Sequence, residues 1–359
     1  MATKRYDSLD GLRALACLGI VLMHVQSNIA VKPSENFLTT NIIGFCGNLV
    51  LLFMMVSAFS LCCGYFGKFS NGSICIEDFY KKRWRRIWPF FAFLVLIDVV
   101  VCIIKQHFTL DNVVFGELWE AFADLTLAFG LIPGNGIEVV GVGWFLGVIF
   151  LFYMVFPYFT FLIGNPKRAW LSMAISILLC IAINEYFAIV KSDVAGGNSL
   201  IINCMPYFIA GGLLYIYRER GEIFANLTAR IILFVFATIF TILFFVFPEY
   251  RFPYANLVMY ALWIICAVAE SFGNRNKTLL NNKLMKFISN ISMEMYLCHM
   301  MMFRVVGFLH LERFVTNNNI LYIIYCVLVI GSAAVFSVLW KKIEEKLLLS
   351  PSCNPQPKR

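Results

Sequence analysis

Long apolar runs recur along the chain and are separated by short polar segments that are rich in basic residues. The runs are roughly 15 to 23 residues long, and about 20 apolar residues in a helix cross the hydrocarbon core of a bilayer. This pattern predicts an all-α polytopic membrane protein with about ten transmembrane helices. The expected spans are about 12–30, 42–64, 88–104, 144–163, 169–190, 203–217, 229–247, 254–272, 288–310 and 320–340.

The distribution of Lys and Arg predicts the orientation of these spans. With the N-terminus in the cytoplasm, about 22 of the 29 Lys and Arg residues fall on the cytoplasmic side and about five outside, as the positive-inside rule requires. Both termini are therefore expected in the cytoplasm. Counting the apolar segment 118–133 as another full span would put the later basic loops outside, so we expect that segment to be interfacial or re-entrant. We expect one transmembrane domain over residues 1–346 and a short, disordered cytoplasmic tail over 347–359.

Composition supports this fold class. Hydrophobic residues make up 60% of the chain and charged residues 14%, whereas about 25% of a soluble domain is charged. The net charge of +8 follows from topology, so we expect no nucleic-acid partner. The 12 Cys residues show no CxxC pair and no zinc-ligand spacing, which indicates free thiols and no metal site. The first apolar run is too long and too interrupted by polar residues for a cleaved signal peptide, so we expect an uncleaved first span.

Arg13 and His24 are ionisable residues within the first expected span. They are eleven positions apart, which places them on one face of a helix and ~17 Å apart along its axis. Arg13 would lie near the cytoplasmic surface and His24 near the middle of the membrane. Ionisable groups at such depth usually face a protein interior or a wet cavity, and histidine is suited to proton transfer. The alternative is that both only pack helices, since Asp10 suits an i,i+3 pair with Arg13.

A basic segment, FYKKRWRRIWPFF at 79–91, is expected to be a cytoplasmic loop that leads into the third span. Arginine forks bind phosphate well, and the two Trp side chains suit a membrane interface. The segment is thus a candidate anion site. An ordinary positive-inside anchor, or a site for the head groups of anionic membrane lipids, is equally supported. The candidate residues for binding an anion are Lys82, Arg83, Arg85 and Arg86.

The ninth expected span carries unusual polar residues in SNISMEMYLCHMMMFR, 289–304. His299 lies at a depth similar to that of His24, so two of the four histidines match in depth. Tyr296 and His299 are candidates for orienting an acceptor or stabilising an oxyanion, and Glu294 is a candidate for substrate binding. For His299, a role as a core hydrogen-bonding residue is the stronger alternative.

An aromatic span, GVGWFLGVIFLFYMVFP at 141–157, follows a Gly-rich segment. Trp144 and Tyr153 could stack on a sugar, although helix packing is the ordinary role of such an aromatic stripe. Asp98 and Glu185 are further acids within spans, and structural pairing is the expected role for each.

The order of these motifs resembles the membrane acyltransferase-3 family. The resemblance covers nearly the whole chain and implies ten spans. Two positions depart from the family pattern, since Ala58 replaces the Gly of a second-span motif and Ile149 replaces a Glu found in many glycan O-acetyltransferases of the family. Ile149 puts the peptidoglycan-type subgroup in doubt. The matching segments are LDGLRALACLGIVLMH, FMMVSAFSL, RWRRIWP, WFLGVIFLFYMVFP and ISMEMYLCH.

The resemblance implies an acyltransferase for groups other than amino-acyl groups, and the apolar composition with its many free cysteines suits a plasma or inner membrane. The resemblance further implies transfer of an acyl group, usually acetyl, from cytoplasmic acyl-CoA to a hydroxyl of a cell-envelope glycan or lipid-linked sugar. It also implies that Arg13 and His24 form an essential pair and that Arg83 and Arg86 form a functional basic motif.

On this interpretation the basic cluster and Arg13 hold the nucleotide end of CoA, while the pantetheine arm runs along the His24 face. His24 then acts as general base on the acceptor hydroxyl or carries the acyl group transiently. The alternative is a proton-coupled transporter or flippase of an acyl or sugar compound, with His24 and Glu294 as a proton relay. A catalytically inactive scaffold or sensor is a third possibility. Release of free CoA distinguishes the enzyme from the transporter.

Overall fold

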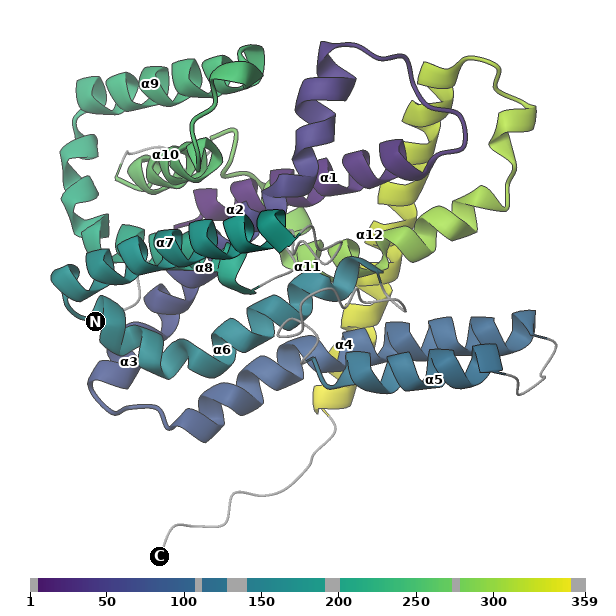
Figure 1. Ribbon diagram of the computed structural model, residues 1–359, viewed down its shortest axis with the longest axis horizontal. Helices are drawn as coiled ribbons and strands as arrows, with labels where there is room; N and C mark the ends of the chain where they lie inside the picture. The colour runs from purple at the N-terminus through teal and green to yellow at the C-terminus, as the bar shows by residue number, and fades with distance from the viewer. Residues whose placement is uncertain (1–5, 107–111, 128–140, 191–200, 273–277, 350–359) are drawn as a thin grey trace, which may run out of the picture.

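The computed structural model describes residues 6–106, 112–127, 141–190, 201–272 and 278–349. Over these residues the protein consists of helices and connections, with no strand (Figure 1). The expectation of an all-α polytopic membrane protein is confirmed. The helices are α1 (Ser8–Asn28), α2 (Leu49–Leu61), α3 (Gly67–Ser70), α4 (Ile76–Lys105), α5 (Asn112–Leu125), α6 (Trp144–Ile163), α7 (Pro166–Val190), α8 (Ile201–Tyr217), α9 (Leu227–Val246), α10 (Ala255–Glu270), α11 (Lys283–Gly307) and α12 (Asn318–Leu349).

Each expected span corresponds to one helical stretch of the structure. Among the described residues, seven such stretches are long and apolar enough to cross a membrane. They contain α1, α2, α4, α6, α7, α9 and α12, and α2 is the central part of a longer stretch over Leu38–Ser70. The other three expected spans correspond to α8 and α10, which are 17 and 16 residues long, and to α11, which is 25 residues long but more polar. The number of crossings and the cytoplasmic location of the termini remain predictions.

The basic segment 79–91 is helical, so the expectation of a loop there was wrong. α4 begins at Ile76, and Glu77 and Asp78 lie in its first turn, where acidic side chains interact favourably with the helix dipole. Lys and Arg are good helix formers, and Pro89 is accommodated within the helix. Because the helix is continuous, its successive basic residues point to different faces.

α11 lies among α1, α4 and α12 in the middle of the molecule (Figure 1). Its contacts with α1 progress from the Asp10–Ser289 hydrogen bond to the His24–His299 ring contact, so α1 and α11 run parallel. Its contacts with α12 run in the reverse order, so α11 and α12 are antiparallel. The first and ninth spans are expected to cross in the same direction, and the ninth and tenth in opposite directions. The observed directions agree with that alternation.

A close approach of α2 and α8 explains one glycine. A Cβ atom at Gly211 would lie 2.3 Å from the carbonyl oxygen of Met55 and 2.8 Å from Cβ of Ala58. Only glycine allows two helix backbones to come so near. Ala58 occupies the position of a glycine in the family that this chain resembles. Its side chain is fully buried at this contact and adds to the tight packing of α2 on α8.

α5 packs along α4 (Figure 1). The indole Nε1 of Trp88 on α4 donates a hydrogen bond to the carbonyl oxygen of Leu125, at 3.1 Å. α5 contains the first part of the segment 118–133, and residues 128–140 lie outside the described residues. At the other end of the chain, α12 continues through Leu349, past the boundary expected at residue 346. Residues 350–359, which make up most of the expected tail, also lie outside the described residues.

Candidate functional site

Arg13 is held by polar contacts to α2 and to an aspartate of its own helix, which in turn contacts α11. Its Nη2 donates to Oγ of Ser60 in the stretch containing α2, at 2.6 Å. Its Nη1 lies 3.4 Å from Oδ1 of Asp10, so the expected i,i+3 pair forms. The same Asp10 oxygen accepts a hydrogen bond from Oγ of Ser289 on α11, at 3.1 Å. These contacts fix the guanidinium between α1, α2 and α11.

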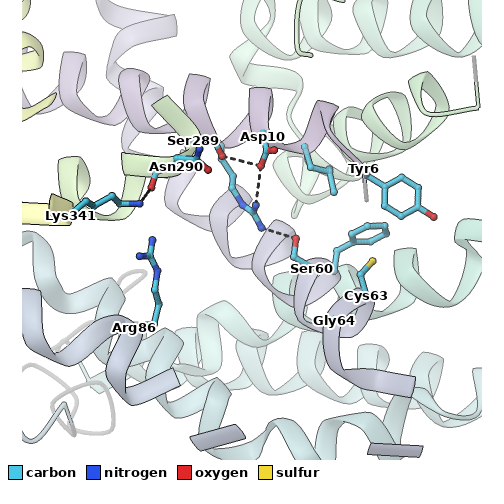
Figure 2. Close-up of a pocket in the computed structure, with 12 residues that line it drawn as sticks. Tyr6, Asp10, Ser60, Cys63, Gly64, Arg86, Ser289, Asn290 and Lys341 are labelled. Carbon is cyan, nitrogen blue, oxygen red and sulfur yellow. Dashed lines mark hydrogen bonds and ion pairs between the residues drawn. The ribbon is translucent and has the colours of Figure 1, made fainter. Parts of the chain in front are cut away.

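Two adjoining cavities meet at Arg13. The first, which we call the mouth cavity, has a volume of about 530 Å³, and its lining includes Asp10, Ser60, Arg86 and Lys341 (Figure 2). The second, which we call the inner cavity, has a volume of about 260 Å³. Three residues line both cavities and so mark their junction, namely Arg13, Arg86 and Ser289. The lining of the inner cavity also includes Phe53, Arg83, Phe145, Ile149, Tyr153 and Tyr296.

The basic residues of α4 divide between two faces of the helix. Arg83 and Arg86 line the inner cavity, one turn apart. Nη2 of Arg83 donates to the hydroxyl of Tyr65 at 2.9 Å, and its guanidinium lies 5.2 Å from the centre of that ring. Lys82 and Arg85 are exposed and line neither cavity. The structure therefore brings two of the four candidate anion-binding residues to the cavities, and a role for Lys82 and Arg85 remains a prediction.

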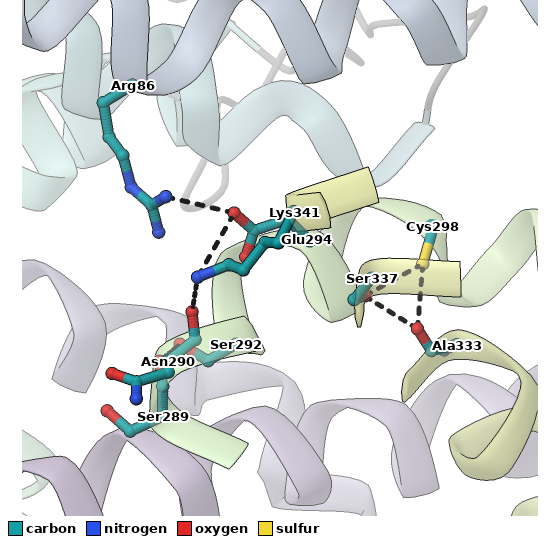
Figure 3. Close-up of polar contacts among 9 residues, drawn as sticks. All are labelled: Arg86, Ser289, Asn290, Ser292, Glu294, Cys298, Ala333, Ser337 and Lys341. Carbon is teal, nitrogen blue, oxygen red and sulfur yellow. Dashed lines mark hydrogen bonds and ion pairs between the residues drawn. The ribbon is translucent and has the colours of Figure 1, made fainter. Parts of the chain in front are cut away.

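Glu294 is buried between two basic side chains (Figure 3). Its Oε1 lies 3.2 Å from Nη1 of Arg86 and 3.9 Å from Nζ of Lys341. Nζ of Lys341 also donates to the carbonyl oxygen of Asn290. Glu294, suggested by the sequence as a substrate-binding residue, is absent from the lining of both cavities and instead faces two cations.

Lys341 did not emerge from the sequence as a site residue. It follows the last expected span, among the basic residues expected on the cytoplasmic side. Its position at the end of that span, next to Lys342, was the one available signal. Nothing local distinguishes the two lysines until α12 is packed against α11.

Aromatic side chains form the wall of the inner cavity. The ring of Tyr296 lies 5.7 Å from that of Phe145 and 6.4 Å from that of Phe53, measured between centroids. The Tyr296 hydroxyl donates to the carbonyl oxygen of Val142 at 2.7 Å. Of the two candidates for sugar stacking, Tyr153 lines the inner cavity, whereas Trp144 packs against the edge of Phe145 and is absent from the cavity lining.

Ile149 also lines the inner cavity. It is the position at which the chain departs from many glycan O-acetyltransferases of the resembling family. The side chain is buried and apolar, so this point of α6 places no carboxylate opposite the arginines of α4. The departure therefore falls within the site.

His24 and His299 are absent from the lining of both cavities, and His299 contacts Tyr296, which lines the inner cavity. Their ring centroids are 5.1 Å apart, and the His299 ring is 6.1 Å from that of Tyr296. Nδ1 of His299 lies 2.6 Å from the carbonyl oxygen of Tyr296. A carbonyl only accepts, so Nδ1 carries the proton, and in the neutral ring Nε2 then holds a lone pair. Within the described residues, Nε2 of His299 is buried and has no hydrogen-bond partner.

These features define an integral membrane protein with a cation-lined cavity, one lining residue of which, Tyr296, contacts the buried member of a pair of histidines. The family model described as "Acyltransferase domain", of the acyltransferase-3 type, matches residues 6–338. The chain belongs to the acyltransferase-3 family, so the resemblance of its motifs is confirmed.

One curated relative is similar to part of the chain. "Protein 2 in picA locus" of Rhizobium radiobacter is 26% identical over 131 residues, which cover 36% of this chain. The match spans 63% of that relative's length. No solved structure matches the chain.

Proposed function

We propose that this acyltransferase transfers an acyl group, most simply acetyl, from cytoplasmic acyl-CoA to a hydroxyl of an envelope glycan or lipid-linked sugar at the plasma membrane. The observation that carries the proposal is the junction of the two cavities. Arg13, Arg86 and Ser289 line both cavities, and the lining of the inner cavity includes Tyr296, whose ring is 6.1 Å from that of His299, the neighbour of His24. A donor with an anionic head and a narrow arm fits these two cavities, with the head in the mouth cavity and the arm in the inner cavity.

The mouth cavity suits the anionic head of the donor. Arg13, Arg86 and Lys341 present cationic groups there, and Asp10 is the carboxylate in its lining. Guanidinium groups form paired, charge-assisted hydrogen bonds to phosphate oxygens. Arg13 is ~17 Å along α1 from His24, so it holds the head of the donor rather than the reacting carbonyl.

The inner cavity suits the thioester end of the donor. Its wall is mainly apolar and aromatic, which excludes water from the reactive group. The Tyr296 hydroxyl is engaged with the Val142 carbonyl, so Tyr296 contributes its ring to the wall in this conformation. A role for its hydroxyl toward an oxyanion requires that this hydrogen bond break.

In the proposed reaction, the neutral imidazole of His24 is the general base. Its free ring nitrogen takes the proton of the acceptor hydroxyl while the hydroxyl oxygen attacks the thioester carbonyl. The carbon–sulfur bond then breaks, and the proton passes to the departing CoA thiolate. In a two-step variant, His24 itself first accepts the acyl group and CoA leaves before the acceptor arrives. His299 acts through its contact with the His24 ring, as a positioning residue.

The test combines a purified system with cells. The protein in proteoliposomes is given acetyl-CoA together with glycans and lipids extracted from the cell envelope as acceptors, and free CoA is measured by chromatography. Envelope polysaccharides and lipids from cells with and without the gene are compared by mass spectrometry. We expect one CoA released for each ester formed, and an acyl group missing from one envelope molecule in the deleted strain. Uptake of an acyl or sugar compound driven by a pH gradient, without CoA release, would instead establish the transporter.

A further inference from the structure

Lys341 extends the cationic site beyond the region that defines the family. It lies on α12, past residue 338, where the family match ends. Its side chain reaches back to the mouth cavity and donates to the Asn290 carbonyl on α11 (Figure 3). This contact holds the ammonium group at the rim of the cavity.

Arg86 and Lys341 share one carboxylate oxygen. Oε1 of Glu294 lies 3.2 Å from Nη1 of Arg86 and 3.9 Å from Nζ of Lys341. Both distances exceed the roughly 2.7–2.9 Å of a strong charge-assisted hydrogen bond. The carboxylate therefore holds two cations near each other without saturating either. A guanidinium has five donor N–H groups and an ammonium has three, so both retain donor capacity toward an anion.

The exposed fractions of the three side chains show that the remaining donor groups of Arg86 and Lys341 point toward the mouth cavity. The side chain of Glu294 is 1% exposed, whereas those of Arg86 and Lys341 are 41% and 25% exposed. Both cations line the mouth cavity, and Glu294 is absent from its lining. The carboxylate thus lies behind the two cations, which face the cavity from α4 and α12. Both terminal nitrogens lie within 4 Å of one oxygen, so one phosphate group can contact them together.

A second ion pair between the same helices shows a different arrangement. Asp98 on α4 and Arg304 on α11 are 2.9 Å apart. One cation faces one carboxylate there, at the distance of a direct charge-assisted hydrogen bond. That pair joins the two helices and leaves no surplus charge. At Glu294, one carboxylate oxygen lies within 4 Å of two cations, and both cations line the mouth cavity.

We propose that Lys341 is a donor-binding residue. Together with Arg86 it forms a two-cation clamp for a phosphate group of the thioester donor, and Glu294 is the positioning residue that keeps the two side chains together. The inference rests on the proposed function for the identity of the donor. According to this proposal, the mouth cavity recognises a thioester donor that carries phosphate groups and does not recognise one that lacks them.

The experiment compares two donors in the full-length protein. Acetyl-CoA carries the phosphates, whereas S-acetylpantetheine carries the thioester arm alone. We expect Lys341→Ala to raise the KM for acetyl-CoA roughly 10-fold, as the loss of one charge-assisted hydrogen bond predicts. The kcat and the KM for S-acetylpantetheine should stay unchanged. Lys341→Arg should restore most of the affinity, and Lys342→Ala, which removes an exposed lysine next to it, is the matched control.

Other outcomes overturn the inference. An unchanged KM for acetyl-CoA in Lys341→Ala, or an equal loss with both donors, would assign the lysine to helix packing alone. Calorimetric titration of CoA into the wild type and Lys341→Ala separates this inference from the proposed function. If the wild-type protein binds CoA more tightly than Lys341→Ala but releases no CoA from acetyl-CoA, the clamp is supported and the acyl transfer is refuted. A wild type that binds no CoA would refute both.

Discussion

The imidazole rings of His24 and His299 lie 5.1 Å apart, at an angle of 48°, although they come from opposite ends of the chain. They meet because α1 and α11 run side by side in the same direction. His299 is fully buried, and its Nδ1–H is directed to the Tyr296 carbonyl. The orientation of the His299 ring is therefore fixed by its own helix, and His24 is the half-buried member of the pair.

The first prediction concerns His24. Replacing it with Ala should reduce acyl transfer at least about 100-fold, since a positioned general base contributes about 10² to 10⁴ in rate. The variant should insert normally, because His24 packs at the edge of the core and Ala is a good helix former. The measurement is CoA release in proteoliposomes, with protein amount and thermal unfolding recorded in parallel.

The control for His24→Ala is His310→Ala. His310 is exposed and contacts Glu312 in the connection after α11. Its replacement should leave the rate within about twofold of the wild type, as expected for a surface change. A His24→Ala enzyme that keeps its activity while correctly inserted would remove the proposed base.

The second prediction separates His299 from His24. If His299 acts by holding the His24 ring, then His299→Ala should lower kcat while leaving the KM for acetyl-CoA near its wild-type value. Groups that act as a unit have non-additive effects. The double variant His24→Ala/His299→Ala should therefore be no slower than His24→Ala alone. A further loss of about tenfold or more in the double variant would indicate an independent role for His299.

The helices and the depth of the two histidines could be predicted from the sequence. Runs of apolar residues of membrane-spanning length locate a helix whatever its neighbours are. Because helical rise is fixed, His24 and His299 could be assigned similar depths by counting residues from the expected cytoplasmic ends. Whether the two histidines face each other depends on how α1 and α11 pack, which the sequence does not reveal. Only the parallel contact of α1 and α11 brings the two rings together.

The arrangement of the basic residues was predicted less completely. The basic run on α4 indicated an anion site, but the loop expected there left open which side chains point inward. In the continuous helix, Arg83 and Arg86 share the inward face, and Lys82 and Arg85 do not. Lys341 contributes through α12, and a contact between helices so distant in sequence has no local signal.

The third prediction uses this division of α4. Arg83→Ala/Arg86→Ala should raise the KM for acetyl-CoA roughly 100-fold, because two charge-assisted contacts to the donor are lost, that of Arg86 at the mouth cavity and that of Arg83 in the inner cavity. Lys82→Ala/Arg85→Ala removes the same two charges from the same helix but from its exposed face. It should change the KM less than about threefold. Equal effects of the two double variants would mean that α4 acts through general charge, as a membrane anchor does, and would refute the phosphate assignment.

The last prediction concerns stability and the carboxylate of Glu294. Glu294→Gln keeps the shape of the side chain but leaves Arg86 and Lys341 close together without their shared counter-charge. Removing one partner of a buried ion pair costs about 3–5 kcal/mol. Arg86 is 41% exposed to the cavity and is hydrated there, so we expect about 1–3 kcal/mol.

Asp98→Asn is the matched control for Glu294→Gln, because it breaks the other ion pair between α4 and α11. Asp98 is 20% exposed and Arg304 57%, so this pair is screened by solvent and its loss should cost less than about 1 kcal/mol. Thermal unfolding in detergent should therefore show a larger drop in Tm for Glu294→Gln. An equal or larger drop for Asp98→Asn would mean that Glu294 does not hold the two cations against their mutual repulsion. The arrangement of the mouth cavity would then need another cause.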